Sequence, residues 1–301
     1  MVKPMQSQEQ GETPPLVTVA MPVFNAGNYL RLAVLSIVRQ TFTDWELLII
    51  DDGSTDDALQ NIADIDDPRI RVIRDGENKG LAARLNECID MAKGQYFARM
   101  DQDDVSYPER FARQIESLQN DSEVDLVATR AITIDENDQA TGLFPYAISH
   151  EEICARPWRG FYLAHPTWMG RIEWFRKYHY TVPGPYFCED QDLLLRSYRE
   201  SRFVTLDEIL FAYRIRGRVS WKKLARTRST VFAAQLRYFV SLNQWLFVLL
   251  ATATFFAKRS SDLSKRMQGG VFKPGCDIVD DVVVLEWHKV LNDLATEQKA
   301  Q

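Results

Sequence analysis

Two pairs of carboxylates stand directly after apolar segments of the chain. Asp51 and Asp52 end one such segment, and Asp101 and Asp103 end another. In open α/β sheets, ligands bind outside the carboxyl ends of the strands. Two acidic strand ends in one region therefore predict a crevice that holds a cation and a polyanion. This pattern favours an enzyme that acts on a phosphorylated donor through a divalent metal.

The second pair is a candidate metal site. Alternate residues of an extended segment project to the same side, so Asp101 and Asp103 can face one ion. Carboxylate oxygens favour Mg²⁺ or Mn²⁺, which complete their coordination with water and substrate phosphates. Such an ion would neutralise a leaving diphosphate. The alternative is a solvated acidic turn that begins a helix.

Two further carboxylate groups each allow two interpretations. Asp52 can accept hydrogen bonds from a nucleobase or from ribose hydroxyls, whereas residues 54–56 that follow it have the types that cap a helix. Asp190, with Glu189 beside it, can act as the general base that removes a proton from a hydroxyl acceptor. The alternative for this pair is an acidic helix start that the helix dipole stabilises.

The elements that must position these groups alternate between strands and helices. Short apolar segments rich in β-branched residues predict the strands, and apolar residues at helical spacing predict the helices. Strands are expected at 16–21, 45–50, 70–73, 95–100 and 124–128, and helices at 30–38, 58–65, 80–92 and after Pro108. This alternation predicts an α/β fold with a mainly parallel sheet that is covered on both faces.

Composition narrows the class of protein. The chain has 301 residues, of which 46% are hydrophobic and 26% charged, as in an ordinary globular protein. Its net charge of −6 argues against a nucleic-acid partner. The four cysteines form no CxxC pair, and residues 1–15 lack the apolar core of a signal peptide. We therefore expect reduced thiols, a disordered leader over 1–14 and a cytoplasmic location.

The C-terminal part has a strong charge asymmetry. Residues 209–261 contain Lys and Arg but no Asp or Glu, which favours contact with something anionic. Within them, 245–257 is almost wholly apolar, but spanning a bilayer takes about 20 residues. Two interpretations stay open: a helix packed against the rest of the chain, or an interfacial helix on an anionic membrane surface.

Five motifs occur in an order that is seen in one known family. They are Val17–Asn25, Asp51–Asp56, Asn78–Asn86, Arg99–Asp104 and Glu189–Leu193. Through them, the chain resembles glycosyltransferase family 2 over roughly residues 15–220. The resemblance implies a GT-A type α/β fold, with a mostly parallel Rossmann-like sheet flanked by helices. It implies a catalytic domain at 15–220, divided into a nucleotide-sugar and metal half at 15–130 and an acceptor half at 131–220, and then a helical, basic and apolar extension at 221–301.

The resemblance also assigns residues to the donor and the metal. The donor contacts are Pro22, Phe24, Asp52, Arg84 and Asp101. Asp103 is the principal ligand of a divalent metal, Mn²⁺ or Mg²⁺, and Asp101 contacts either the ribose or the metal shell.

On the acceptor side, the resemblance makes Asp190 the catalytic base, with Glu189 beside it, and places His165 near the acceptor. Trp168 belongs to an aromatic-rich segment over 157–187 and is a candidate for stacking on a sugar face. The alternative for these rings is core packing.

The chain departs from the family pattern in two places. Related chains often have a Tyr-Arg-x-His segment, whereas this chain has Arg214 and Arg216 in that segment. Since Arg cannot coordinate a metal as His can, we expect Arg214, Arg216 or Arg218 to bind the diphosphate instead. A Gln-x-x-Arg-Trp signature of processive synthases is missing, which favours addition of a single sugar.

The sequence therefore predicts an inverting, metal-dependent glycosyltransferase that uses a nucleotide sugar, with UDP as the first expectation. The expected acceptor is a hydroxyl of a saccharide or lipid-linked molecule in cell-surface polysaccharide or glycolipid synthesis, with peripheral contact to the inner face of the membrane. One alternative is a nucleotidyltransferase, but residues 21–27 lack the Gly-rich basic loop typical of that class. The other is a non-catalytic binding module, which would be expected to have lost the acidic residues that this chain keeps.

Overall fold

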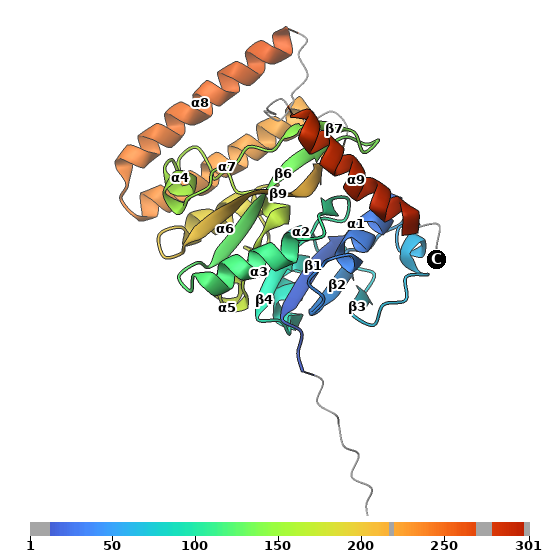
Figure 1. The fold of residues 1–301 in the computed structure, drawn as a ribbon. Helices are drawn as coiled ribbons and strands as arrows, with labels where there is room; N and C mark the ends of the chain where they lie inside the picture. The colour runs from blue at the N-terminus through green and yellow to red at the C-terminus, as the bar shows by residue number, and fades with distance from the viewer. Residues whose placement is uncertain (1–12, 217–219, 269–278, 298–301) are drawn as a thin grey trace, which may run out of the picture.

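A computed structural model describes residues 13–216, 220–268 and 279–297. The described part forms one mixed sheet with helices on both faces and three longer helices at its C-terminal end (Figure 1). Most of the expected leader at 1–14, and Arg218, lie outside the described residues. The sheet order is β3-β2-β1-β4-β8-β6-β9-β5, and β7 pairs with β6.

The first half of the sheet is parallel, as predicted. It consists of β1 (Val17–Val23), β2 (Trp45–Asp51), β3 (Ile70–Arg74) and β4 (Tyr96–Arg99). The register aligns Val23 of β1 with Asp51 of β2 and Ala20 with Arg99 of β4, so the carboxyl ends of these strands meet at one edge. That edge is where the acidic motifs begin.

Alternation along these buried strands produces two cores. In β2, Leu47 and Ile49 pack on one face, and Leu48 and Ile50 pack on the other. The first face is covered by helices α1 (Tyr29–Val38) and α3 (Arg110–Asn120). The second is covered by α2 (Leu81–Met91), α5 (Ile172–Lys177) and α6 (Glu189–Ser197). Because both faces are apolar, the strands read as continuous hydrophobic segments.

The second half of the sheet is mixed rather than parallel. The strands are β5 (Val105–Ser106), β6 (Leu126–Ile134), β7 (Ala140–Leu143), β8 (Met169–Arg171) and β9 (Phe203–Arg214). β8 runs antiparallel to both of its neighbours, β4 and β6, whereas β6 and β9 are parallel. The short helix α4 (His150–Cys154) begins at Ser149, whose hydroxyl accepts a hydrogen bond from the Glu152 amide in a capping box.

One expected helix is much shorter than predicted. The segment 58–65 contains only a 3₁₀ turn at Gln60–Ile62. Asp66, Asp67 and Pro68 follow directly, and the residue before a proline is disfavoured in the helical region. A second 3₁₀ turn, His165–Thr167, precedes β8.

The C-terminal extension is helical, as predicted. Helices α7 (Trp221–Ser241) and α8 (Trp245–Met267) pack against each other as a hairpin, and α9 (Asp281–Glu297) lies against α1 (Figure 1). α8 continues ten residues past the apolar segment that ends at 257. In the described chain, no helix is both long enough and apolar enough to cross a bilayer. On α9, the buried Trp287 stacks on Tyr107 at 6.3 Å between ring centroids.

Candidate active site

The predicted metal carboxylates stand in the loop that follows β4. Asp101 accepts a charged contact from Arg99, with Nη2 2.7 Å from Oδ1. Asp103 pairs with Arg216, with Nε 2.7 Å from Oδ2. Burial and the neighbouring charge of Asp101 raise the pKa of the Asp103 carboxyl. A cation bound here would offset the repulsion between the two carboxylates that raises the pKa of Asp103.

Arg214 holds the loop after β4 in place through its backbone and its side chain. Its backbone N–H donates to Asp104 Oδ1 and its side-chain Nε donates to the Asp103 carbonyl, each at 2.7 Å. Its Nη2 lies 2.6 Å from Asp138 Oδ1, and the side chain has no exposed surface. Arg214 is therefore a positioning residue in this structure, and its predicted contact with a diphosphate stays a prediction. Arg216 is 37% exposed and can present its guanidinium to an anion next to Asp103.

The donor set fits a divalent ion of the Mg²⁺ or Mn²⁺ kind. Asp101 and Asp103 offer hard oxygen atoms, and their side chains are 28% and 15% exposed, so both remain accessible. Over the described ranges, no group of three or more potential ligand side chains is gathered around one point. Mg²⁺ is usually held by one or two carboxylates together with substrate phosphates, so two carboxylates suffice for this chemistry.

The loop after β1 is tied to the acidic loop by a residue that sequence reasoning did not single out. The Gln102 side chain accepts from the Phe24 N–H at 2.6 Å and donates to the Phe24 carbonyl at 3.0 Å. Phe24 itself is 45% exposed, and Pro22 is buried inside β1. The exposed ring is thus held beside the acidic loop, where the sequence predicts the nucleobase to bind.

Residues 54–56 do not cap a helix in this structure; they hold the loop after β1. Ser54 Oγ accepts from the Asn25 N–H at 3.1 Å, and Asp56 Oδ2 accepts from the Gly27 N–H at 2.7 Å. Gly53 has φ +75°, and a Cβ there would lie 3.2 Å from the Glu77 backbone. The loop after β1 and the loop after β2 are thus joined by hydrogen bonds and form one wall at the carboxyl edge of the sheet.

Asp52 faces the start of α2. Its carboxylate accepts from the backbone N–H groups of Lys79 and Gly80 and from Arg84 Nε at 2.9 Å. Arg84 is 1% exposed and also pairs with Asp75 and Glu87, which together raise its pKa. Because Arg84 has so little exposed surface, its role in this structure is to hold Asp52 in position. Direct contacts of Arg84 and Asp52 with the donor stay predictions.

The two candidate general-base carboxylates stand at the start of helix α6. Glu189 and Asp190 lie in its first turn, where the positive end of the helix dipole favours carboxylates. Burial and then the charge of Asp190 raise the pKa of Glu189 to about 7, and burial also raises the pKa of Asp190. A carboxyl group tuned toward neutral pH is suited to general base catalysis.

His165 lies next to Glu189, and Trp168 packs against His165. The His165 imidazole lies 2.7 Å from the Tyr180 hydroxyl and 3.9 Å from Glu189 Oε1, and burial lowers its pKa well below the usual value. The Trp168 ring is fully buried and meets His165 edge-on, with 4.5 Å between centroids. A ring without exposed surface cannot stack on a sugar, so the structure corrects the prediction for Trp168 and makes it a packing residue.

Arg99 lies between the two acidic groups, and sequence reasoning assigned it no role. Besides its contact with Asp101, its positive charge lowers the pKa of both Glu189 and Asp190, against the effect of burial. Its side chain is almost fully buried, and in the described chain its Nε and Nη1 have no hydrogen-bond partner. The expected alternation of Asp101 and Asp103 along an extended segment does not apply, because β4 ends at Arg99 and residues 102–103 form a turn.

Comparison with known proteins agrees with this arrangement. A family model described as "Glycosyl transferase family 2" matches residues 18–179, more than half of the chain. EpsE of Bacillus subtilis is 34% identical over 207 residues, which cover 66% of this chain and 73% of EpsE. An uncharacterized glycosyltransferase of Methanocaldococcus jannaschii is 27% identical over 277 residues, or 84% of this chain and 94% of that protein.

Solved structures share the fold. S. aureus TarS 1-349 in complex with UDP superposes with a TM-score of 0.57 at 18% identity, covering 73% of this chain and 65% of that one. Mannosyltransferase PcManGT from Pyrobaculum calidifontis, in complex with GDP-Man and Mn²⁺, gives a TM-score of 0.55 at 16% identity, covering 85% and 79%. The predicted GT-A type α/β fold with a helical C-terminal extension is confirmed. The chain belongs to glycosyltransferase family 2.

Proposed function

We propose that the chain transfers a sugar from a nucleotide donor to a hydroxyl acceptor with inversion, at a site that uses a divalent metal. The observation that carries this proposal is the position of Arg99. Its guanidinium contacts Asp101 and lies within electrostatic reach of Glu189 and Asp190. This link supports the proposal that the metal carboxylates and the base carboxylates serve one site, as a single displacement requires.

In the proposed reaction, Asp190 removes the proton of the acceptor hydroxyl while its oxygen attacks the anomeric carbon. The new bond forms on the face opposite the bond that breaks to the diphosphate, so the configuration inverts. Asp101 and Asp103 would hold a divalent ion, which would supply positive charge near the departing diphosphate. Arg216 can add a second cation beside it. Orientation of the two substrates and stabilisation of the leaving group supply most of the acceleration.

The donor in this proposal is a UDP-sugar. The S. aureus TarS structures contain UDP or UDP-GlcNAc, and the P. calidifontis enzyme contains GDP-Man, so nucleotide sugars occupy this fold in both cases. A nucleotidyltransferase is not favoured, because the loop after β1 presents the exposed ring of Phe24 and no basic Gly-rich phosphate loop.

A donor screen tests the proposal. Nucleotide release is measured from UDP- and GDP-sugars with Mn²⁺, with Mg²⁺ and with chelator. We expect release from one UDP-sugar above all, only with a metal, since the leaving diphosphate needs charge neutralisation. Release of pyrophosphate from a nucleoside triphosphate and a sugar phosphate would instead identify a nucleotidyltransferase. Absence of release from every donor would contradict the proposed function.

We further propose that the enzyme works at an anionic membrane surface, in polysaccharide or glycolipid synthesis. Leu249, Phe256 and Leu263 lie seven residues apart on α8 and are 68%, 64% and 57% exposed. Arg259 and Arg266 are exposed one helical turn away from these side chains. A helix with an exposed apolar stripe and cations beside it is typical of an interfacial helix on anionic lipid.

Vesicle binding tests this contact. The double variant L249S/F256S is expected to bind phosphatidylglycerol vesicles at low salt at least about tenfold more weakly, because each apolar side chain buried in the interface is worth roughly 1.5–3 kcal/mol. Cosedimentation measures the effect. Leu285→Ser is the matched control, since Leu285 is 67% exposed on α9. Undiminished binding by the double variant, or an equal loss in the control, would remove α8 from the membrane contact.

A further inference from the structure

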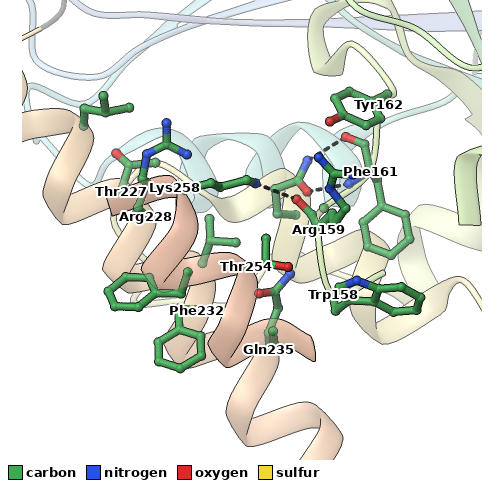
Figure 2. Close-up of a pocket in the computed structure, with 16 residues that line it drawn as sticks. Trp158, Arg159, Phe161, Tyr162, Thr227, Arg228, Phe232, Gln235, Thr254 and Lys258 are labelled. Carbon is green, nitrogen blue, oxygen red and sulfur yellow. Dashed lines mark hydrogen bonds between the residues drawn. The ribbon is translucent and has the colours of Figure 1, made fainter. Parts of the chain in front are cut away.

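A cavity of about 280 Å³ lies between helices α7 and α8 and the loop at 158–162 (Figure 2). Its walls are largely apolar. Phe232 of α7 and Phe255 of α8 stack with 4.5 Å between ring centroids, and Trp158 closes the side toward the loop. Tyr162, at the edge, is 46% exposed. A cavity with such walls accepts an apolar chain.

Three cations also line this cavity. Lys258 Nζ donates to the Arg159 carbonyl at 2.9 Å, and Figure 2 shows this contact across the cavity. Arg228 lines the same space and pairs with Asp262, with Nη2 2.9 Å from Oδ1. Burial and then the charges of Arg228 and Arg159 lower the pKa of Lys258. Asp262 neutralises Arg228, and no carboxylate stands among the described residues that line the cavity, so the charges of Arg159 and Lys258 leave it with an excess of positive charge. An anion would relieve this repulsion.

The cavity reaches the candidate base through one side chain. Gln191 lines it and follows Asp190 directly. Its carboxamide oxygen accepts from the Phe161 N–H at 2.9 Å, and its nitrogen donates to the Phe161 carbonyl and to Asp190 Oδ2, each at 3.2 Å. Gln191 therefore joins the wall of the cavity to the group that would deprotonate the acceptor. The donor carboxylates lie elsewhere, at the strand ends.

We propose that this cavity binds the acceptor, and that the acceptor is an amphiphile with a phosphate group next to an apolar chain. The inference rests on the proposed function and names its acceptor class. Arg159 and Lys258 contact the phosphate, and the aromatic walls hold the first part of the chain. Inorganic phosphate would leave these walls without a role, and a neutral lipid would leave Arg159 and Lys258 without a counter-charge.

The position of the cavity on α8 supports the same occupant. Lys258 faces the cavity, whereas Leu249 and Phe256 are exposed. α8 thus has one face toward the cavity and another available to a membrane. An acceptor anchored in the bilayer could place its phosphate in the cavity while its chain leads back to the lipid.

Binding of dodecyl phosphate to the full chain tests the inference, at concentrations below the micelle threshold and without any donor. We expect Lys258→Gln and Arg159→Gln each to weaken binding about tenfold, in keeping with loss of one charge-assisted hydrogen bond. Lys258→Arg should restore most of the affinity. Lys265→Gln is the matched control, because Lys265 is exposed on the same helix outside the cavity. Thermal unfolding verifies that each variant is folded.

Two competing ligands test which part of the amphiphile the cavity binds, the phosphate or the apolar chain. Dodecyl maltoside and inorganic phosphate are each expected to compete at least tenfold less well than dodecyl phosphate. Equal competition by the maltoside would overturn the role of the cations, and equal competition by phosphate would overturn the role of the apolar walls. An equal loss in Lys265→Gln would also overturn the inference. These binding measurements use no donor, and the proposed function is tested separately, by nucleotide release from the unmodified chain. A negative result in one experiment therefore does not imply a negative result in the other.

Discussion

Asp103→Ala is expected to abolish metal-dependent turnover of the donor, with kcat/KM reduced by roughly a hundredfold or more, the scale of losing one key electrostatic contact in a transition state. Asp103 is the partly buried carboxylate that pairs with Arg216 and faces Asp101. Its removal leaves Asp101 as the remaining carboxylate of the predicted pair. The leaving diphosphate would then lose its neutralising charge while the acceptor side stays intact.

The measurement is nucleotide release titrated with Mn²⁺ and Mg²⁺. Asp66→Ala is the matched control, since Asp66 is an exposed carboxylate far along the chain from the loop after β4. Asp103→Ala should stay folded, because it relieves a repulsion with Asp101 and breaks one partly exposed ion pair. If the unmodified chain turned over its donor fully in the presence of chelator, the metal would have no place in the reaction.

The sequence was most informative where the physical signal is local. Buried strands at 45–50 and 95–100 are mostly apolar segments, and the acidic residues after them follow directly in the chain, so both could be placed without long-range information. The parallel half of the sheet followed from the alternation of strands and helices. The orientation of β8 did not, because a three-residue strand has too little pattern to predict its partner.

The roles of charged residues were harder to predict than their positions. Arg84 and Arg214 occur in segments that the family pattern marks as functional, yet both are buried, and each pairs with a carboxylate that is distant in sequence, Asp52 and Asp138 respectively. Whether an arginine faces a ligand or an internal carboxylate depends on these tertiary contacts. For the same reason no role could be assigned to Arg99 from sequence, because its contact with Asp101 and the effect of its charge on Glu189 and Asp190 depend on the tertiary structure.

The C-terminal extension illustrates the same limit. The apolar segment at 245–257 allowed either packing or a membrane contact, and the described α8 has a surface for each: Phe255 packs on Phe232, while Phe256 is exposed. Likewise α9, at the end of the C-terminal extension, contributes Trp287, whose indole N–H donates to the Asp138 carbonyl at 2.7 Å. Asp138 in turn holds Arg214, so α9 is connected to the loop of the candidate metal site.

Asp190→Asn is expected to keep donor binding and lose transfer by about a hundredfold to ten-thousandfold, the usual contribution of a general base. The change removes a proton acceptor and preserves the size of the side chain. Donor affinity, measured by calorimetry with Mn²⁺, should stay within about twofold, because the predicted donor contacts lie at the strand ends. An active Asp190→Asn variant would remove this residue from the mechanism.

Glu189→Gln is the matched comparison, because the two carboxylates are neighbours in one helical turn and both are largely buried. If Asp190 is the base, Glu189→Gln should keep transfer. The reverse outcome would move the role to Glu189. Since burial raises the pKa of both carboxyls, and that of Glu189 to about 7, protonation reaches this pair at a higher pH than it reaches an exposed carboxyl. Transfer by the unmodified chain should therefore decline at a higher pH than an exposed aspartate would set, because burial raises the pKa of Asp190. The residual activity of Asp190→Asn should show no such decline, because its base is already gone.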